Sequence, residues 1–456
     1  LFPYTTLFRS KEVIITAKHH DGFCLWPTQL TDYCIRNSPY KNGKGDIVGE
    51  LAAACKKYGI KFGVYLSPWD RHQANYGTPE YVEYFYKALK ELLTNYGTIS
   101  EVWFDGANGG DGWYGGSKEI RKIDRKTYYQ FERAHEIVDE LQPEAVIFSD
   151  GGPGCRWIGN ESGFAGATNW SFLRSKDVYP GYDKYEELQY GHADGDKWVP
   201  GECDVSIRPG WFYHPSEDKK VKTVPELVDL YYRSVGRNAN FLLNFPVNRD
   251  GLISPLDSAN AVNYHQQIRH ELSHNLLTGI RPIASNERGK GFEASNVSDN
   301  KYDTYWATAD NVKSAVLTFT LSKATKINRL LLQEYIPLGQ RVKSFVVEYQ
   351  FKGKWNAIDP KEETTTIGYK RILRFPTITT DKLRIRFIDA RGCLCINNIA
   401  AYYSGSDDQK ITDRSELKVE GYSFVLSGVD PVEMNKAVDR NKLTTCFIKD
   451  NKVVID

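Results

Sequence analysis

The chain has 456 residues, which is too long for a single hydrophobic core and predicts two or three domains. Its 59 basic and 58 acidic residues give a net charge of +1, so no global field favours nucleic acid or a membrane surface as a partner. The sequence has no run of eighteen apolar residues that would predict a membrane span. Aromatic residues make up 13% of the chain, a supply of flat apolar faces suited to stacking on sugars.

The first ten residues, Leu1–Ser10, have no signal-peptide anatomy, since a basic start, a long apolar core and a cleavage site of small residues are all missing. They resemble the translated product of a sequencing adapter. We interpret residues 1–10 as a non-native segment fused to a gene that is cut at its start.

From residue 11 onward, strand and helix patterns alternate, which predicts a parallel sheet with helices between its strands. Seven strands are one short of a (β/α)8 barrel, so we predict an α/β domain over 11–278 that is a (β/α)8-type barrel lacking its first strand. The strands are expected at Glu12–Ala17, Lys61–Leu66, Ser100–Phe104, Ala145–Phe148, Phe164–Asn169, Lys197–Pro200 and Asn240–Asn244.

Beyond residue 279 the pattern changes to short strands that alternate apolar and polar residues, as half-buried antiparallel strands do. We therefore predict an antiparallel β-sandwich over 279–404. Residues 405–456 are interpreted as a linker and the start of a further β-rich segment. The expected sandwich strands are Ala315–Leu321, Ile327–Glu334, Lys343–Tyr349, Arg371–Phe375 and Lys382–Phe387.

Two of the predicted barrel strands end abruptly in titratable residues. His19 and His20 follow the first strand, and Asp105 follows the third, beside Trp103. Parallel strands deliver catalytic groups at their carboxyl ends. Asp105 is therefore the first candidate for the pair of carboxylates that glycoside hydrolysis needs, although a helix N-cap or turn aspartate explains its position equally well.

The second carboxylate has two candidates. Glu161 lies in a loop bracketed by glycines, where an acid can be aimed at a ligand, and Arg156 nearby could adjust its charge. An ordinary solvated glutamate is the alternative interpretation. Glu202 is the rival; it too lies near the end of a predicted strand and could instead hold a substrate hydroxyl.

Histidines and aromatic residues supply the expected pocket. His19 and His20 can donate hydrogen bonds to sugar hydroxyls at neutral pH. Because no third ligand is apparent beside them and no Cys/His cluster has zinc spacing, we expect no metal site there. The eight cysteines form no CxxC pair and are interpreted as buried free thiols. Candidates for the pocket wall are Tyr65, Trp69 and Trp211.

Four segments carry a specific family resemblance. They are Lys18–Phe23 (KHHDGF), Tyr65–Asp70 (YLSPWD), Glu101–Gly106 (EVWFDG) and Arg156–Gly163 (RWIGNESG). Together they resemble the retaining α-L-fucosidases of glycoside hydrolase family 29, over roughly residues 11–274. RWIGNESG is similar to the branch of that family that prefers fucose linked α-1,3 or α-1,4 to a branched glycan.

The resemblance implies an exo-acting enzyme in which Asp105 is the nucleophile and Glu161 the acid/base of a double displacement. It implies fucosylated oligosaccharides or glycoproteins as substrates, no cofactor for catalysis, and a periplasmic or extracellular location. Family members have a further barrel strand ahead of this region, so a truncated chain could be inactive. Residues implied to line the fucose pocket are His19, His20, Tyr65, Trp103 and, at a pocket-side position, Glu202.

The second predicted domain resembles a discoidin-like, coagulation-factor-type domain with a galactose-binding sandwich fold. The resemblance rests on Ala294–Trp306, which looks like its opening loop, and on Cys395–Ala400 near its end. Such domains often bind terminal sugars, although many only pack on the catalytic domain, and they can hold a structural calcium ion near a loop of Asp, Thr and Trp residues.

Two other functions stay open from the residues alone. The barrel could be a retaining hydrolase of another sugar, such as galactose, which release assays on fucosides and galactosides would distinguish. The chain could also be a non-catalytic glycan-binding protein, for which binding to glycans without product release would be the sign.

Overall fold

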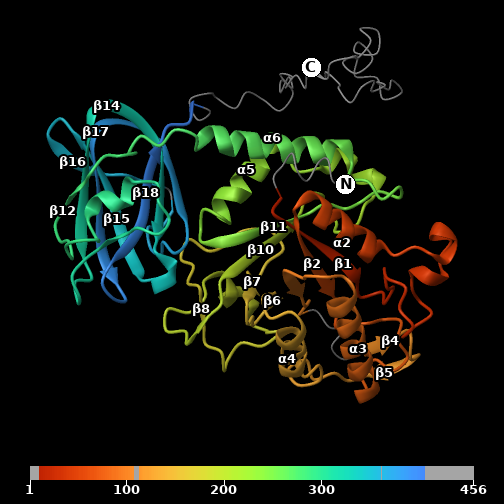
Figure 1. Ribbon diagram of the computed structural model, residues 1–456. Helices are drawn as coiled ribbons and strands as arrows, with labels where there is room; N and C mark the ends of the chain where they lie inside the picture. Colours follow the sequence, from red (N-terminus) through yellow and green to blue (C-terminus); the bar gives the residue numbers. More distant parts are fainter. Residues whose placement is uncertain (1–9, 107–111, 361, 406–456) are drawn as a thin grey trace, which may run out of the picture. The chain divides into compact units, whose positions relative to one another are not determined.

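The computed structural model describes residues 10–106, 112–360 and 362–405. Its first sheet has seven strands in the order β1-β2-β3-β6-β7-β10-β11, and every pairing along it is parallel (Figure 1). Among the described residues, β1 and β11 are the edges of this sheet, so its strands form an open parallel sheet. The strands are β1 Glu12–Lys18, β2 Lys61–Leu66, β3 Glu101–Trp103, β6 Val146–Ser149, β7 Cys155–Trp157, β10 Gly201–Ser206 and β11 Ala239–Asn244.

The prediction of a parallel α/β sheet is confirmed, but two of its predicted strands were wrong. Phe164–Asn169 contains no strand, and the fifth strand is β7, which is only three residues long and holds a buried arginine. Lys197–Pro200 contains the short strand β9 (Lys197–Trp198), which pairs antiparallel with β8 (Phe172–Leu173) outside the parallel sheet. A short strand with a charged centre has no apolar run to reveal it.

Local sequence signals explain where the helices begin and end. The Asp46 side chain accepts a hydrogen bond from the Gly49 N–H at 2.8 Å and caps α2, which ends at Gly59 with a φ of 65°. Proline stands in the first turn of α3 and of α5, where its missing N–H costs nothing. The helices are α2 Ile47–Tyr58, α3 Pro79–Asn95, α4 Phe131–Leu141, α5 Val224–Arg233 and α6 Pro255–Glu271.

Packing of α2 against β1 and β2, and of α3 against α4, buries the apolar face of each helix. Phe85, Leu89 and Leu92 of α3 are each at most 1% exposed, and burial of such a side chain contributes about 1.5–3 kcal/mol. Shorter elements complete this part of the chain. They are the hairpin β4 (Gly112–Tyr114) and β5 (Glu119–Arg121), and 3-10 turns at Ile35–Asn37, Tyr40–Gly43, Tyr185–Gln189 and Pro215–Lys220.

The second sheet is antiparallel, as predicted, and follows the order β13-β18-β14-β17-β15-β16 with β12 paired to β14. Four of the expected strands merge into two long ones, β14 and β17, and β14 changes its register against β17 between Thr320 and Thr325. We call residues 283–402 the antiparallel domain. Its strands are β12 Ile283–Ala284, β13 Trp306–Ala307, β14 Ala315–Glu334, β15 Val342–Phe351, β16 Lys354–Ala357, β17 Arg371–Ala390 and β18 Cys395–Tyr402, with 3-10 turns at Ala294–Ser298 and Ile336–Leu338.

Buried polar groups join the antiparallel domain to the parallel sheet, and a single compact unit extends to Ser404. Gln340 is 2% exposed; its Oε1 accepts from the Ser171 N–H at 2.7 Å and its Nε2 donates to the Asn169 carbonyl at 2.9 Å. The hydroxyl of Thr366 accepts from the Asn169 N–H at 2.7 Å. The antiparallel domain thereby holds the backbone of the long loop that follows β7.

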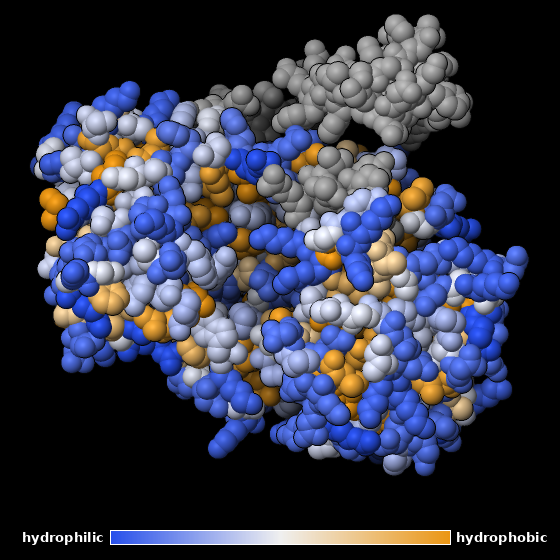
Figure 2. Space-filling view, viewed as in Figure 1, coloured by the Kyte–Doolittle hydropathy of each residue, from blue (hydrophilic) through white to orange (hydrophobic). Residues whose placement is uncertain are grey.

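The surface seen in Figure 2 is mostly hydrophilic, and its hydrophobic residues form small separate groups. In the described part of the chain, no helix has the length and apolar character that crossing a bilayer would require.

Candidate active site

The carboxyl ends of β1, β2 and β3 bring three of the predicted site residues together. Tyr65 lies on β2, His20 just after β1 and Asp105 just after β3. The Tyr65 hydroxyl donates to Asp105 Oδ2 at 2.6 Å, and His20 Nε2 lies 3.5 Å from the same oxygen. The side chain of Asp105 is 21% exposed, so the carboxylate is hydrogen-bonded by Tyr65 and still reaches solvent.

Flat rings form a wall beside this carboxylate. The Tyr65 ring stacks on His19 with centroids 5.6 Å apart and on Trp103 with centroids 5.1 Å apart. Trp103 stacks in turn on Phe148 at 3.9 Å. Tyr65 and Trp103, both implied by the family resemblance to line the pocket, therefore lie together as part of one stack of aromatic rings.

Trp69 closes another side of the site. Its ring lies 4.6 Å from the His20 ring, centroid to centroid. Its indole Nε1 is buried and has no hydrogen-bond partner among the residues that the structure describes. Buried indole N–H groups usually have a partner, so this one is a donor available to a ligand.

Burial controls the charge state of the two histidines. It lowers the pKa of His20 to about 4, although the neighbouring Asp105 acts in the opposite direction. Burial also lowers the pKa of His19. Both imidazoles are therefore neutral at pH 7, and each has one N–H donor and one acceptor nitrogen. Burial, followed by Asp105, raises the pKa of Tyr65, which keeps its hydroxyl protonated as a donor.

A buried ion pair fixes the strand ends that carry these groups. Lys18 Nζ lies 3.1 Å from Asp70 Oδ2, and both side chains are fully buried. The Ser67 N–H donates to the Lys18 carbonyl at 2.9 Å, and the Arg71 N–H donates to the His20 carbonyl at 2.8 Å. The segments KHHDGF and YLSPWD are thus tied to each other by backbone and side-chain bonds.

Glu161 lies in the loop after β7, and its side chain is exposed. Its Oε2 accepts a hydrogen bond from Trp211 Nε1 at 3.1 Å. The next residue, Phe212, packs edge-on against the His19 ring at 5.2 Å. The segment Trp211–Phe212 therefore connects the predicted acid/base to the histidines beside Asp105, at one end of the parallel sheet.

Glu202 lies beneath the aromatic wall rather than in an open pocket, since it is only 4% exposed. Its Oε1 accepts from Trp103 Nε1 at 3.1 Å. Burial raises the pKa of Glu202, and burial together with Glu202 raises the pKa of the neighbouring Glu101. Glu202 thus supports the indole of Trp103 from inside the sheet.

Glu101→Gln is expected to stabilise the protein at high pH and to change little at low pH. Because the folded-state pKa of Glu101 lies above the ordinary value of 4.5, the folded protein keeps a proton that the unfolded chain loses. The contribution of this proton to the free energy of unfolding is complete below the ordinary pKa of 4.5. It decreases as the pH rises toward the folded-state pKa, by up to about 1.4 kcal/mol per pH unit. Urea unfolding near pH 5 and near pH 8 measures this decrease, which should be smaller in the variant.

The exposed Glu132 in the first turn of α4 offers a matched control, and Glu132→Gln should keep the pH dependence of the wild type. If Glu101→Gln and the wild type lose the same free energy of unfolding between the two pH values, Glu101 is not the group that keeps its proton in the folded protein.

Arg156 has a structural position and does not face the site. Its side chain is fully buried, and its guanidinium donates to the carbonyls of Leu188 and Val199 and to Asn169 Oδ1. All of these bonds hold the long loop after β7. We therefore interpret Arg156 as an anchor of the loop that carries Glu161, and not as a residue that contacts substrate.

Asp150 and Asp204 are buried carboxyl groups near the site that the sequence analysis missed. Asp150 follows β6, accepts from the Gly181 N–H at 2.6 Å, and burial raises its pKa to about 7. It packs so closely on Gly106 that a Cβ there would lie 2.1 Å from its Oδ2. Asp204 on β10 accepts from Trp157 Nε1 at 2.8 Å, and burial raises its pKa. Asp150 follows an apolar strand, the same signal that marked Asp105.

Two metal expectations came from the sequence: no metal beside His19 and His20, and a possible calcium ion in the second domain. Beside His19 and His20 the structure places Asp105 as a third group, with ligand atoms of all three within 4.8 Å of one another. In the loop expected to hold calcium, the Asn397 amide nitrogen donates to the carbonyls of Lys301, Tyr302 and Thr304 at 2.8–3.3 Å. Carbonyl oxygens are ligands that calcium takes in proteins, so calcium at this loop stays a prediction.

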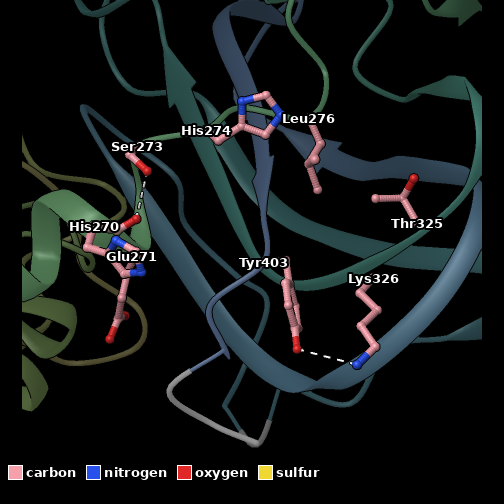
Figure 3. A pocket seen from close by; sticks show the side chains of 8 residues that line it. All are labelled: His270, Glu271, Ser273, His274, Leu276, Thr325, Lys326 and Tyr403. Atoms are coloured by element: carbon pink, nitrogen blue, oxygen red, sulfur yellow. Dashed lines mark hydrogen bonds between the residues drawn. The ribbon is translucent and has the colours of Figure 1, made fainter.

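Two hollows lie apart from Asp105. A cavity of about 190 Å³ lies between the end of α6 and β14, and it contains none of the predicted site residues (Figure 3). A hollow of about 460 Å³ includes Tyr182, next to the Gly181 that binds Asp150. The lining of this second hollow is polar and consists of Lys126, Arg174, Lys176, Asp177, Tyr182, Asp183, Lys184 and Glu187.

Comparison with known protein families assigns both domains. The family model for α-L-fucosidase matches residues 10–263, and the model for the F5/8 type C domain matches residues 283–400. Alpha-L-fucosidase 1 of Arabidopsis thaliana is 42% identical over 420 residues, which cover 90% of this chain and 80% of that protein. A putative alpha-L-fucosidase 1 of Oryza sativa is 43% identical over 384 residues, covering 83% of this chain and 71% of the relative.

Solved structures give the same result. A putative alpha-L-fucosidase from Bacteroides thetaiotaomicron has a TM-score of 0.80 and 39% identity, covering 88% of this chain and 86% of that one. A glycoside hydrolase family 29 fucosidase from Ruminococcus gnavus, solved in complex with fucose, has a TM-score of 0.78 and 32% identity, with coverages of 90% and 85%. The chain therefore belongs to the α-L-fucosidase family, glycoside hydrolase family 29, and is a glycoside hydrolase with a C-terminal F5/8 type C domain.

Proposed function

We propose that the protein is an exo-acting, retaining α-L-fucosidase that removes fucose linked α-1,3 or α-1,4 to glycans. The observation that carries the proposal is the Asp105 carboxylate, which accepts from Tyr65 at 2.6 Å and faces His20 inside a wall of aromatic rings. A partly exposed carboxylate fixed by a hydroxyl donor is suited to attack a sugar carbon from one side.

The reaction is a double displacement. Asp105 attacks the anomeric carbon of fucose while Glu161 protonates the departing glycan oxygen, and a covalent fucosyl-enzyme forms. Glu161 then removes a proton from water, which attacks the same carbon and releases fucose with its configuration retained. The hydrogen bond from Trp211 to Glu161 supports a defined direction for that carboxyl group.

Specific side chains would recognise the fucose. His19, His20 and the buried Trp69 N–H supply polar contacts to hydroxyl groups, while Tyr65 and Trp103 give an apolar surface to the methyl group. Trp211 donates to Glu161 and would therefore lie beside the departing glycan. Glu202 acts at one remove, through its hydrogen bond to Trp103.

The preference for branched glycans rests on RWIGNESG, the segment similar to the α-1,3/1,4-preferring branch. The relatives named as fucosidases favour fucosylated oligosaccharides or glycoproteins as the substrate class. The location typical of the family favours action in the periplasm or outside the cell.

Sugar release assays test the assignment. The protein should release fucose from α-L-fucosides and no galactose from α- or β-galactosides, and it should cleave α-1,3/1,4-fucosylated oligosaccharides in preference to aryl fucosides. Proton NMR of the first product should show α-L-fucose before mutarotation. The β-anomer as first product would exclude the double displacement, and equal release of galactose would exclude the substrate class.

A further inference from the structure

Ser67 is a buried residue of the site to which the proposed reaction gives no role. It directly follows β2 and is fully buried. Its backbone N–H donates to the Lys18 carbonyl at 2.9 Å, which places its side chain beside His20 on the neighbouring strand end. The Ser67 hydroxyl contacts His20 Nδ1 at 2.7 Å.

The direction of this hydrogen bond follows from a second contact. Ser67 Oγ also lies 2.8 Å from the carbonyl oxygen of Trp69. A carbonyl oxygen can only accept, so the single hydroxyl hydrogen of Ser67 is donated to Trp69 and an oxygen lone pair faces His20. Nδ1 of His20 must then be the donor, and it must carry a hydrogen.

This assignment determines the other nitrogen of the ring. A neutral imidazole carries one hydrogen, and burial lowers the pKa of His20 far enough to keep the ring neutral at pH 7. With the hydrogen on Nδ1, Nε2 presents a bare lone pair 3.5 Å from Asp105 Oδ2. Two acceptor atoms thus face each other, and a ligand hydroxyl beside them can donate its hydrogen to Nε2.

We propose that Ser67 is a positioning residue that holds His20 as the Nδ1–H tautomer, so that Nε2 accepts a hydrogen bond from the sugar hydroxyl next to Asp105. The chain of donors runs from His20 through Ser67 to the Trp69 carbonyl. The opposite tautomer would point an N–H at Asp105 and occupy a lone pair of the attacking carboxylate. The part of the proposal that concerns the sugar rests on the proposed function, whereas the tautomer does not.

Nitrogen NMR of the histidine side chains tests the tautomer directly. In the free protein at neutral pH, His20 should show a protonated Nδ1 and an unprotonated Nε2, with its signals assigned by their loss in His20→Gln. In Ser67→Ala the donor chain is broken, and a protonated Nε2 should appear. A wild-type His20 that carries its hydrogen on Nε2, or on both nitrogens, would overturn the proposal even if Ser67→Ala failed to fold.

Ser149 gives a matched control, since it is also fully buried near the end of a strand of the same sheet and donates to the Gly152 carbonyl at 2.6 Å. Ser149→Ala should leave the tautomer of His20 unchanged in the nitrogen spectrum. If the tautomer changed in this variant too, loss of any buried serine nearby would be enough to switch it, and the effect would not be specific to Ser67.

Activity gives the second readout. Ser67→Ala should lower kcat/KM on an α-L-fucoside about 5-fold to 100-fold, the usual effect of leaving one buried polar group unpaired. Unchanged kcat/KM together with a switched tautomer would refute the functional part of the proposal. Because the spectrum of the free protein needs no substrate, failure of the fucosidase assignment and failure of the tautomer assignment give different results.

Discussion

Asp105→Asn is expected to lower kcat on α-L-fucosides by roughly 10⁴-fold or more while leaving the fold intact, because an amide cannot form the covalent fucosyl-enzyme. Asparagine has the same shape, and its side-chain oxygen can still accept from the Tyr65 hydroxyl that now binds Asp105 at 2.6 Å. Binding of fucose should therefore persist. Steady-state kinetics measures the first effect, and calorimetric titration with L-fucose measures the second.

The control for this variant is Asp21→Asn, which removes a negative charge from an exposed aspartate close enough to affect His19. It should change kcat by less than about 10-fold, since nearby surface charge acts only through a screened field. Turnover of Asp105→Asn within about 10-fold of the wild type would remove Asp105 from the role of nucleophile.

Glu161→Gln should slow the enzyme in a way that depends on the leaving group. General acid catalysis contributes about 10²–10⁴-fold, so cleavage of glycans, whose departing oxygen needs a proton, should fall by that factor. Aryl fucosides with an acidic phenol need no such help in the first step. Their covalent intermediate should accumulate instead, because no base activates water in the second step, and a burst of phenol would reveal it.

Azide gives a direct check on this interpretation, since it attacks without a general base and should restore turnover of the aryl fucoside by Glu161→Gln. The control is Glu186→Gln, an exposed glutamate in the same long loop, for which both substrates should be cleaved at wild-type rates. An equal loss on glycans and on activated aryl fucosides, without rescue by azide, would contradict the role of Glu161 as acid/base.

Both variants probe groups that are connected through a few contacts. Trp211 donates to Glu161, and its neighbour Phe212 packs on His19, whose ring stacks on Tyr65. Tyr65 in turn donates to Asp105. Substitutions in this chain of contacts should therefore affect both chemical steps, whereas substitutions at Arg156 or Gln340 should act first on the loop after β7.

Much of the candidate site was predictable because its polar side chains follow apolar strands. The polar ends of β1 and β3 mark His19, His20 and Asp105 in the sequence, and parallel pairing explains why they meet at one edge of the sheet. The same signal was present at Asp150, after β6, and was not used. The strand β7 escaped prediction, since three residues with a buried arginine carry no apolar pattern.

The sequence by itself determined the alternation of parallel strands with helices, the antiparallel second domain, the family resemblance and the candidate residues for the chemistry, because hydrophobic periodicity and short motifs are local properties of a chain. Only the tertiary structure decided what each side chain does. It buried Arg156 and Glu202, brought the Asn397 amide to the loop carbonyls of residues 301–304, and set Ser67 beside His20 across 47 residues of sequence. Burial, pKa and hydrogen-bond direction depend on neighbours that are distant along the chain, and no local pattern records which neighbours those will be.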